Sequence, residues 1–179
     1  MKRLFLVLAL LAPAACRKDA VETRRVPKEG SAAAPMSAAG GAPGGVHWKL
    51  PPGWKELAGN GMRAATFRLP QAAGKAEVSV VVLPGDVGGE LANVNRWRGQ
   101  LALPPVTEDG LADGRATVDS ALGPIFVYDF TGGGEKKTRL CAGMARVSGT
   151  TWFFKLMGDD KAVAAAKPAF LKLLVGLTN

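Results

Sequence analysis

The feature that most restricts the fold of this chain is a series of short apolar segments separated by turns rich in glycine. Such segments cover residues 125–130, 139–147 and 151–156, and the turns between them contain Gly132-Gly133-Gly134 and Ser148-Gly149. Apolar runs of this length joined by Gly-containing turns are typical of neighbouring antiparallel strands. The C-terminal half of the chain is therefore expected to contain an antiparallel meander.

Other segments extend this pattern and add helices. Four more are expected to be strands: residues 47–50, 62–69, 76–83 and 116–118. Both faces of residues 76–83 carry apolar side chains, which indicates a sheet covered on both sides. Helical spacing of apolar residues predicts helices over 90–101 and from about 159 to 177, and Pro168 should kink or restart the second. The expected fold class is α+β, a mostly antiparallel twisted sheet flanked by helices.

The N-terminal part of the chain has a different composition. A basic start at residues 1–3, an unbroken apolar run and a small-residue stretch are typical of a secretory signal peptide, and the run is too short to span a bilayer. The segment that follows is charged at first and then mostly Ala, Gly, Pro and Ser, which predicts a disordered tether. The expected domains are a signal peptide (1–15), a tether (16–45) and one globular domain (46–179).

The end of the signal segment, Ala-Ala-Cys at residues 14–16, resembles the lipobox of bacterial lipoproteins, although Pro13 departs from it. The resemblance implies that Cys16 becomes the acylated N-terminus, carrying a diacylglycerol and a further acyl chain such as palmitate that hold the protein to a membrane. Ordinary cleavage after residue 14 is the alternative, because residues 12–14 form an A-x-A site. The expected location is the extracytoplasmic cell envelope, with the outer membrane favoured, if the organism has one, because Arg17 follows the cysteine in place of Asp.

The charge and the reactive side chains exclude several classes of function. The formal net charge of the full chain is +8, but the expected globular domain, with sixteen basic and twelve acidic residues, carries only +4 of it. This is a mild excess without the dense basic stripe of a nucleic-acid binder, and the export signal also argues against a nucleic-acid partner. Cys141 lies in an apolar segment, as an inert core thiol would. His47 is the sole histidine, and the acidic residues show no catalytic or calcium-binding spacing. We expect no catalytic residue, no metal site and no cofactor, and hence not an enzyme.

One helical segment offers candidate binding residues. They surround a tryptophan: Asn93, Asn95, Arg96, Trp97 and Arg98. Arginine beside an aromatic ring is suited to gripping a carboxylate or a phosphate. The alternative is structural: the tryptophan packs on the sheet, the asparagines tie down neighbouring loops and the arginine stems cover apolar surface.

The region from Trp48 to the C-terminus resembles a poorly characterised bacterial family with a PsbP-like α/β/α sandwich. The resemblance is carried by Pro52-Gly53-Trp54, by residues 62–67 (MRAATF), by residues 93–101 (NVNRWRGQL) and by residues 151–155 (TWFFK). It implies this fold and an extracytoplasmic setting, and it brings no known activity. PsbP-like domains in other proteins serve as accessory and assembly modules. Extending that role to this chain rests on fold analogy alone.

Two functions are compatible with these patterns. The leading hypothesis is an envelope-anchored accessory or scaffold module that docks on another envelope protein through Trp97, Arg96 and Arg98. The alternative is an extracytoplasmic protein that binds a small molecule or an anion in a cleft between that helix and the sheet. A flat, apolar exposed patch would favour docking, whereas a pocket lined by Arg and Asn would favour ligand binding.

Overall fold

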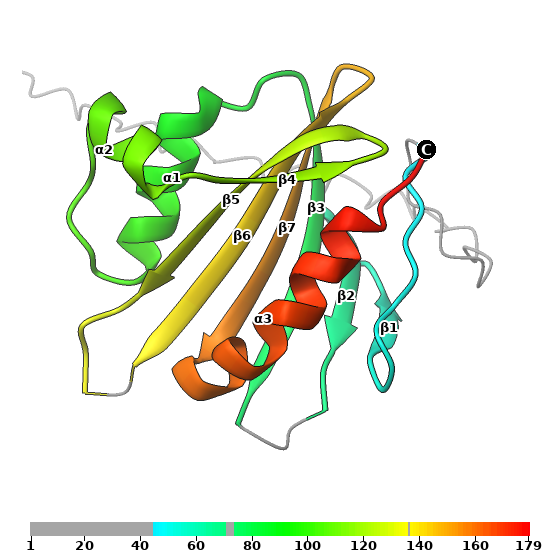
Figure 1. Ribbon diagram of the computed structural model, residues 1–179, viewed down its shortest axis with the longest axis horizontal. Coiled ribbons are helices and arrows are strands. Elements are labelled where there is room, and N and C mark those ends of the chain that lie inside the picture. Colours follow the sequence, from blue (N-terminus) through cyan, green and yellow to red (C-terminus); the bar gives the residue numbers. More distant parts are fainter. Residues whose placement is uncertain (1–44, 71–73, 136) are drawn as a thin grey trace, which may run out of the picture. The chain divides into compact units, whose positions relative to one another are not determined.

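The computed structural model describes residues 45–70, 74–135 and 137–179. They form a seven-stranded antiparallel sheet with the strand order β1-β2-β3-β7-β6-β5-β4 (Figure 1). The strands are β1 (Lys55–Ala58), β2 (Arg63–Arg68), β3 (Ala76–Pro84), β4 (Ala116–Ser120), β5 (Gly123–Thr131), β6 (Thr138–Val147) and β7 (Thr150–Asp159). The helices are α1 (Gly89–Gln100), α2 (Glu108–Gly114) and α3 (Asp160–Val175). The predicted α+β class and the antiparallel meander β5-β6-β7 are confirmed.

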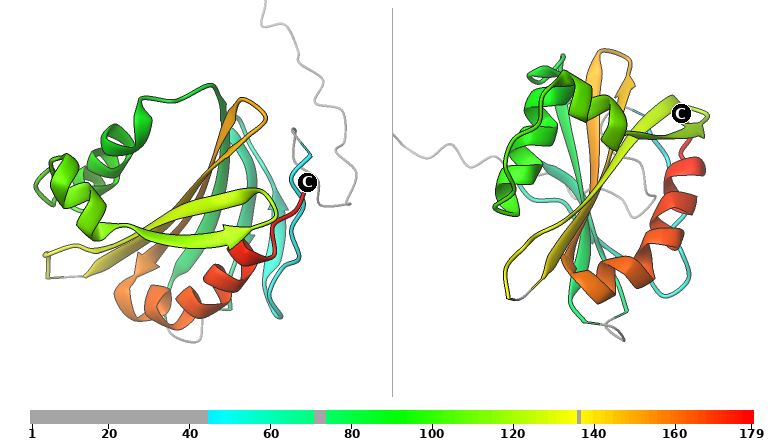
Figure 2. Two further views of the ribbon diagram at one scale, coloured as in Figure 1. Left: turned by 45° about the horizontal axis from the view of Figure 1, so that its top comes forward. Right: turned by 60° about the vertical axis from the view of Figure 1, so that its left-hand side comes forward.

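Helices cover both faces of the sheet, as Figure 2 shows in its right-hand view, where α1 and α2 lie on one side and α3 on the other. Strand β3 supplies side chains to both cores, because successive residues of a strand point to opposite faces. Val78 and Val80 are fully buried in the core under α3, whereas Val81 and Leu83 pack against the core under α1 and α2. The predicted two-sided burial of this strand is thus confirmed.

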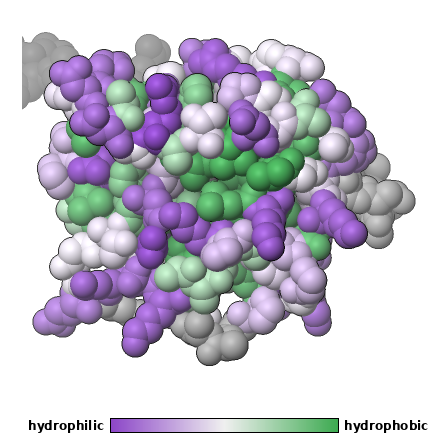
Figure 3. All heavy atoms as spheres, in the orientation of Figure 1, coloured by the Kyte–Doolittle hydropathy of each residue, from purple (hydrophilic) through white to green (hydrophobic). Residues whose placement is uncertain are grey.

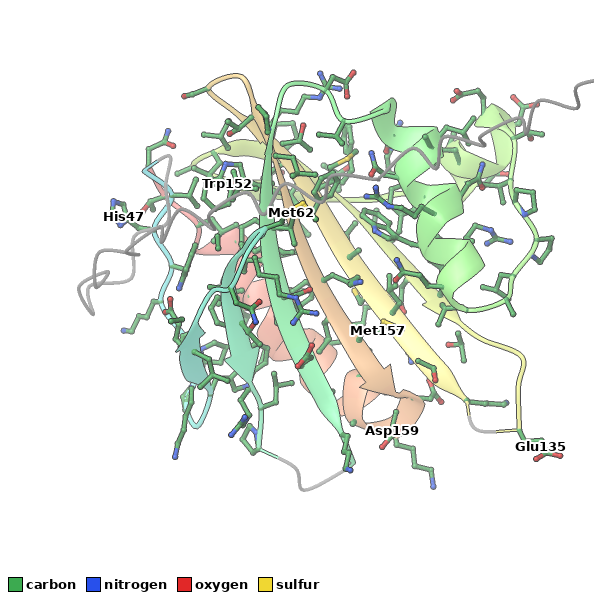
Figure 4. The ribbon with its side chains drawn as sticks, turned by 180° about the vertical axis from the view of Figure 1, so that it is seen from behind. His47, Met62, Glu135, Trp152, Met157 and Asp159 are labelled. Atoms are coloured by element: carbon green, nitrogen blue, oxygen red, sulfur yellow. The ribbon has the colours of Figure 1, made fainter. Side chains whose placement is uncertain are left out.

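The coverage on the α1 side is incomplete. The core beneath α1 is built mainly from β5, β6 and β7, with Tyr128, Leu140 and Phe153 among its buried side chains. Figure 4, which views the molecule from this side, shows no described helix over β1 and β2. Residues there remain accessible, such as Arg68 and Glu77. Within the part of the chain that the structure describes, no helix therefore covers the β1–β2 half of this face of the sheet.

One prediction about secondary structure needs correction. Residues 47–50 are not a strand: only His47 forms a bridge, by reciprocal backbone hydrogen bonds of 2.7 and 3.1 Å with Thr178. The prolines that follow at 51 and 52 lack the N–H groups that a longer ladder would need. Of the two outcomes predicted at Pro168, a kink or a restart, the restart does not occur: helix α3 continues through Pro168 and bends along its length (Figure 2).

The predicted signal peptide (1–15), the lipidation site Cys16 and the tether up to residue 44 lie outside the described residues. Among the residues that the structure describes, no helix is both long enough and apolar enough to cross a bilayer.

Candidate functional site

The predicted binding segment forms α1, and two of its five candidate residues are buried. Trp97 is 3% exposed and packs edge-on against Phe153, with 6.0 Å between the ring centroids. Asn93 is 2% exposed and donates through Nδ2 to the backbone oxygens of Val87 and Gly89 at 2.7 and 2.6 Å. Neither side chain is available to a partner, so the docking mode that uses Trp97 as its anchor is not supported.

Asn95 and Arg98 hold the loop that follows α1. The Asn95 amide donates to the backbone oxygen of Val106 at 3.0 Å and accepts from its N–H at 2.8 Å. Arg98 Nε donates to the backbone oxygen of Pro104 at 2.7 Å, and its guanidinium lies 5.3 Å from the ring centroid of Phe130. These contacts account for both residues as structural supports of the helix and its loop.

Arg96 is different, because its exposed side chain lines a cleft between α1 and the open half of the sheet. We call this space of about 230 Å³ the α1 cleft. Its polar lining comprises Arg63, Ser79, Arg96, Gln100 and Lys155. Its apolar lining comprises Met62, Val81, Leu83, Trp97 and Phe153. Figure 4 shows Met62 in front of the strands on this side.

Strand register brings the polar lining together. Ser79 on β3 stands opposite Thr66 on β2 and opposite Lys155 on β7. Ser79 is 4% exposed, and Lys155 Nζ donates to Oε1 of Gln100 at 3.1 Å. The floor of the cleft is therefore rigid sheet, and one wall is the last turn of α1.

Positive charge dominates the cleft. Burial lowers the pKa of Lys155 below its usual value, and the nearby charges of Arg63 and Arg96 lower it further. Glu77 is the opposing charge, and its Oε1 lies 3.1 Å from Nη1 of Arg63. Arg96 stands 5.9 Å from the ring centroid of Phe153 and also donates to Oδ1 of Asn93. Three cations thus face one carboxylate, which leaves a local excess of positive charge for an anion to balance.

The reactive residues considered in the sequence lie away from this cleft. Cys141 is fully buried in the core under α3, and burial raises the pKa of its thiol to about 12, so the nucleophilic thiolate is disfavoured at neutral pH. His47 lies in the bridge to Thr178. No group of three or more His, Cys, Asp or Glu side chains that could hold a metal ion occurs among the described residues.

Sequence reasoning placed Arg96 in a binding segment but missed Arg63, Ser79 and Lys155. These come from three strands that meet only in the folded sheet. A signal was present in the sequence, since Ser79 interrupts a run of valines and Lys155 interrupts the apolar run of residues 152–157. A polar side chain inside an apolar strand indicates either a partner or a cavity.

Apolar side chains also gather on the opposite side of the molecule. Figure 3 shows them between the β4–β5 hairpin and the C-terminal half of α3. Val118, Leu122 and Leu171 are half-buried against the core there, and Val175 near the end of α3 is 56% exposed.

The described residues therefore define a small α+β sandwich that carries a cationic, partly apolar cleft between α1 and the sheet. No family model and no curated relative matches this chain.

Solved structures with a similar fold have low sequence identity. LpqN of Mycobacterium tuberculosis, described as involved in cell envelope biogenesis, is 13% identical, with a TM-score of 0.48 over 76% of this chain and 84% of that one. Cyanobacterial PsbP from Synechocystis is 14% identical, with a TM-score of 0.47 over 80% and 98%. A Bacteroides thetaiotaomicron protein is 9% identical, with a TM-score of 0.46 over 74% of this chain but only 44% of its own length. The likeness concerns the fold alone.

Proposed function

We propose that this chain is a lipid-tethered, extracytoplasmic module that binds an anionic ligand non-covalently in the α1 cleft. The observation that carries the proposal is the convergence of Arg63, Arg96 and Lys155 on a cleft whose nearest carboxylate is Glu77. Arginine and lysine donors at the edge of a low-dielectric cleft bind carboxylates and phosphates by charge-assisted hydrogen bonds.

The N-terminal pattern supports the tether and the location. A lipobox-like Cys16 after a signal segment would place the domain outside the cytoplasm, held to a membrane through acyl chains. Among the described residues, the lining of the cleft contains two arginines and a lysine but no histidine, cysteine or carboxylate, so this lining is suited to holding an anionic ligand.

The test is a titration of the full chain with acetate and with inorganic phosphate at constant ionic strength, followed by amide chemical shifts. We expect saturable shifts at Ser79, Lys155 and Gln100. Lys155→Met and Arg63→Gln should each weaken binding at least fivefold. Lys172→Met, which removes an exposed lysine on α3, is the matched control and should leave binding unchanged. Binding that is equally strong in all four proteins, or no binding at all, would contradict the proposal.

A further inference from the structure

The lining of the α1 cleft changes from apolar to charged along the strands. On β3 the side chains that face the cleft are Leu83, Val81 and Ser79 in order, two residues apart. On the neighbouring strand β7, Phe153 pairs with Val81 and Lys155 pairs with Ser79. One end of the cleft is therefore aliphatic and aromatic, and the other end is polar and cationic.

The walls follow the same gradient at Arg63 and Gln100, whereas the guanidinium of Arg96 lies where the two ends meet, 5.9 Å from the ring centroid of Phe153. Arg63 on β2 pairs with Val81, but its guanidinium reaches toward the polar end, where it meets Glu77. Gln100, in the last turn of α1, hydrogen-bonds Lys155 at that end. Met62, which is 75% exposed, adds an apolar side chain to the cleft lining next to Arg63. An exposed apolar residue beside a cleft gains burial when a ligand covers it.

From this gradient, and resting on the proposed anion-binding function, we infer that the ligand is an amphiphile. Its anionic head lies between Arg63, Arg96 and Lys155, and its acyl chain lies along Val81 and Leu83 beneath Met62. An anionic head without an acyl chain would leave the apolar end to water, and an acyl chain without an anionic head would leave three cations with Glu77 as the opposing carboxylate.

The size of the cleft limits the length of the ligand's acyl chain that it can hold. About 230 Å³ is less than the roughly 300–1,000 Å³ of pockets that enclose a drug-sized ligand, so the cleft takes a short chain or the first part of a longer one. The charged end is continued by a neighbouring hollow of about 340 Å³, whose lining includes Arg68, Lys75 and Glu77. A head group larger than a carboxylate has cationic partners there. A free fatty acid and an anionic lipid share this chemistry.

The experiment compares four probes on the full chain by calorimetry: acetate, octanoate, octyl phosphate and 1-octanol. We expect octanoate to bind at least tenfold more tightly than acetate, and 1-octanol to bind at least tenfold more weakly than octanoate. Octyl phosphate binding more tightly than octanoate would indicate a lipid phosphate as the natural head, and the reverse order a fatty acid. Both orders agree with the inference.

Two matched variants test where the acyl chain of the ligand lies. Met62→Gln should weaken octanoate binding about threefold or more without changing acetate binding, whereas Val175→Gln, an exposed apolar residue on α3, should change neither. Octanoate that binds no more tightly than acetate would overturn the amphiphile and leave the anion site intact. Equal binding of octanoate and 1-octanol would overturn the anion site itself.

Discussion

Lys155 on β7 donates a hydrogen bond of 3.1 Å to Oε1 of Gln100, and this contact joins the sheet to α1 across the cleft. Lys155 is held partly buried beside two arginines, which lowers its pKa below the usual 10.5. Keeping the charged lysine in the folded state therefore costs free energy, and this destabilisation is present at neutral pH. It lessens as the pH rises past the lowered pKa, because the folded protein then loses the proton before the unfolded chain does.

The first prediction follows from the free-energy cost of keeping the charged Lys155 partly buried. Lys155→Met should raise the free energy of unfolding at pH 7 by about 0.5–2 kcal/mol while weakening anion binding at least fivefold, a trade-off common at binding sites. The gain should shrink between pH 7 and pH 10. Urea unfolding at several pH values measures it, with Lys172→Met as the exposed control. A Lys155→Met variant that is less stable than wild type at pH 7 would show that the Lys155 side chain stabilises the folded state.

The second prediction concerns Glu77, which occupies Arg63 when no ligand is bound. Both side chains are about half exposed, at 42% and 53%, so the ion pair contributes little stability. Glu77→Gln should strengthen octanoate binding about threefold or more, because the ligand no longer competes with a carboxylate for the arginine. The midpoint of urea unfolding should stay nearly unchanged. Weaker octanoate binding in this variant would mean that Glu77 helps to shape the site.

The third prediction concerns the two hydrogen bonds between Asn95 and the backbone of Val106. Asn95→Ala leaves both backbone groups of a partly buried loop without their partner, which should cost about 1–3 kcal/mol of unfolding free energy. Asn60→Ala, at an exposed turn, should cost less than about 0.5 kcal/mol. Denaturant titrations of both variants check this. Equal, small losses would contradict the role of Asn95 as a loop anchor.

The fourth prediction is a pH dependence that arises from Asp129. Burial alone would raise the pKa of this carboxyl, but hydrogen bonds from Arg139 and Lys167 outweigh it and hold the pKa below the usual 3.8. A carboxyl with a lowered pKa stabilises the fold above its unfolded pKa, and this contribution is lost as the pH falls through the folded value. The stability difference between wild type and Asp129→Asn should therefore be constant at neutral pH and shrink below about pH 4. Thermal melts from pH 7 to pH 2 test it; a difference independent of pH would contradict it.

The fifth prediction tests the close approach of β7 to the start of β3. A Cβ on Gly158 would lie 2.1 Å from the backbone oxygen of Lys75 and 2.6 Å from Cα of Ala76, so the backbone would have to move. Gly158→Ala should lower the unfolding free energy by about 2 kcal/mol or more. Gly133→Ala has open space around its Cβ and should have little effect. Similar melting temperatures for the two variants would argue against this strand packing.

Much of the fold follows from local patterns, and the parts that do not have identifiable reasons. The valines of β3 alternate between two cores, so its two-sided burial could be predicted. Strand β1 is exposed along its whole length and α2 buries only Leu111, so neither carries a periodic apolar pattern. The helix that bears Arg96 could be recognised, but the cleft could not, because Arg63 and Lys155 meet through sheet register.

The most direct test of the α1 cleft as the binding site is a map of the amide chemical-shift changes that octanoate induces over the full polypeptide. We predict the largest shifts at Val81, Ser79 and Lys155, and their loss in Lys155→Met. A competing apolar hollow lies beside α3, lined by Trp54, Leu69 and several alanines of that helix. Shifts centred on that hollow, and unchanged in Lys155→Met, would contradict the assignment of the α1 cleft as the binding site.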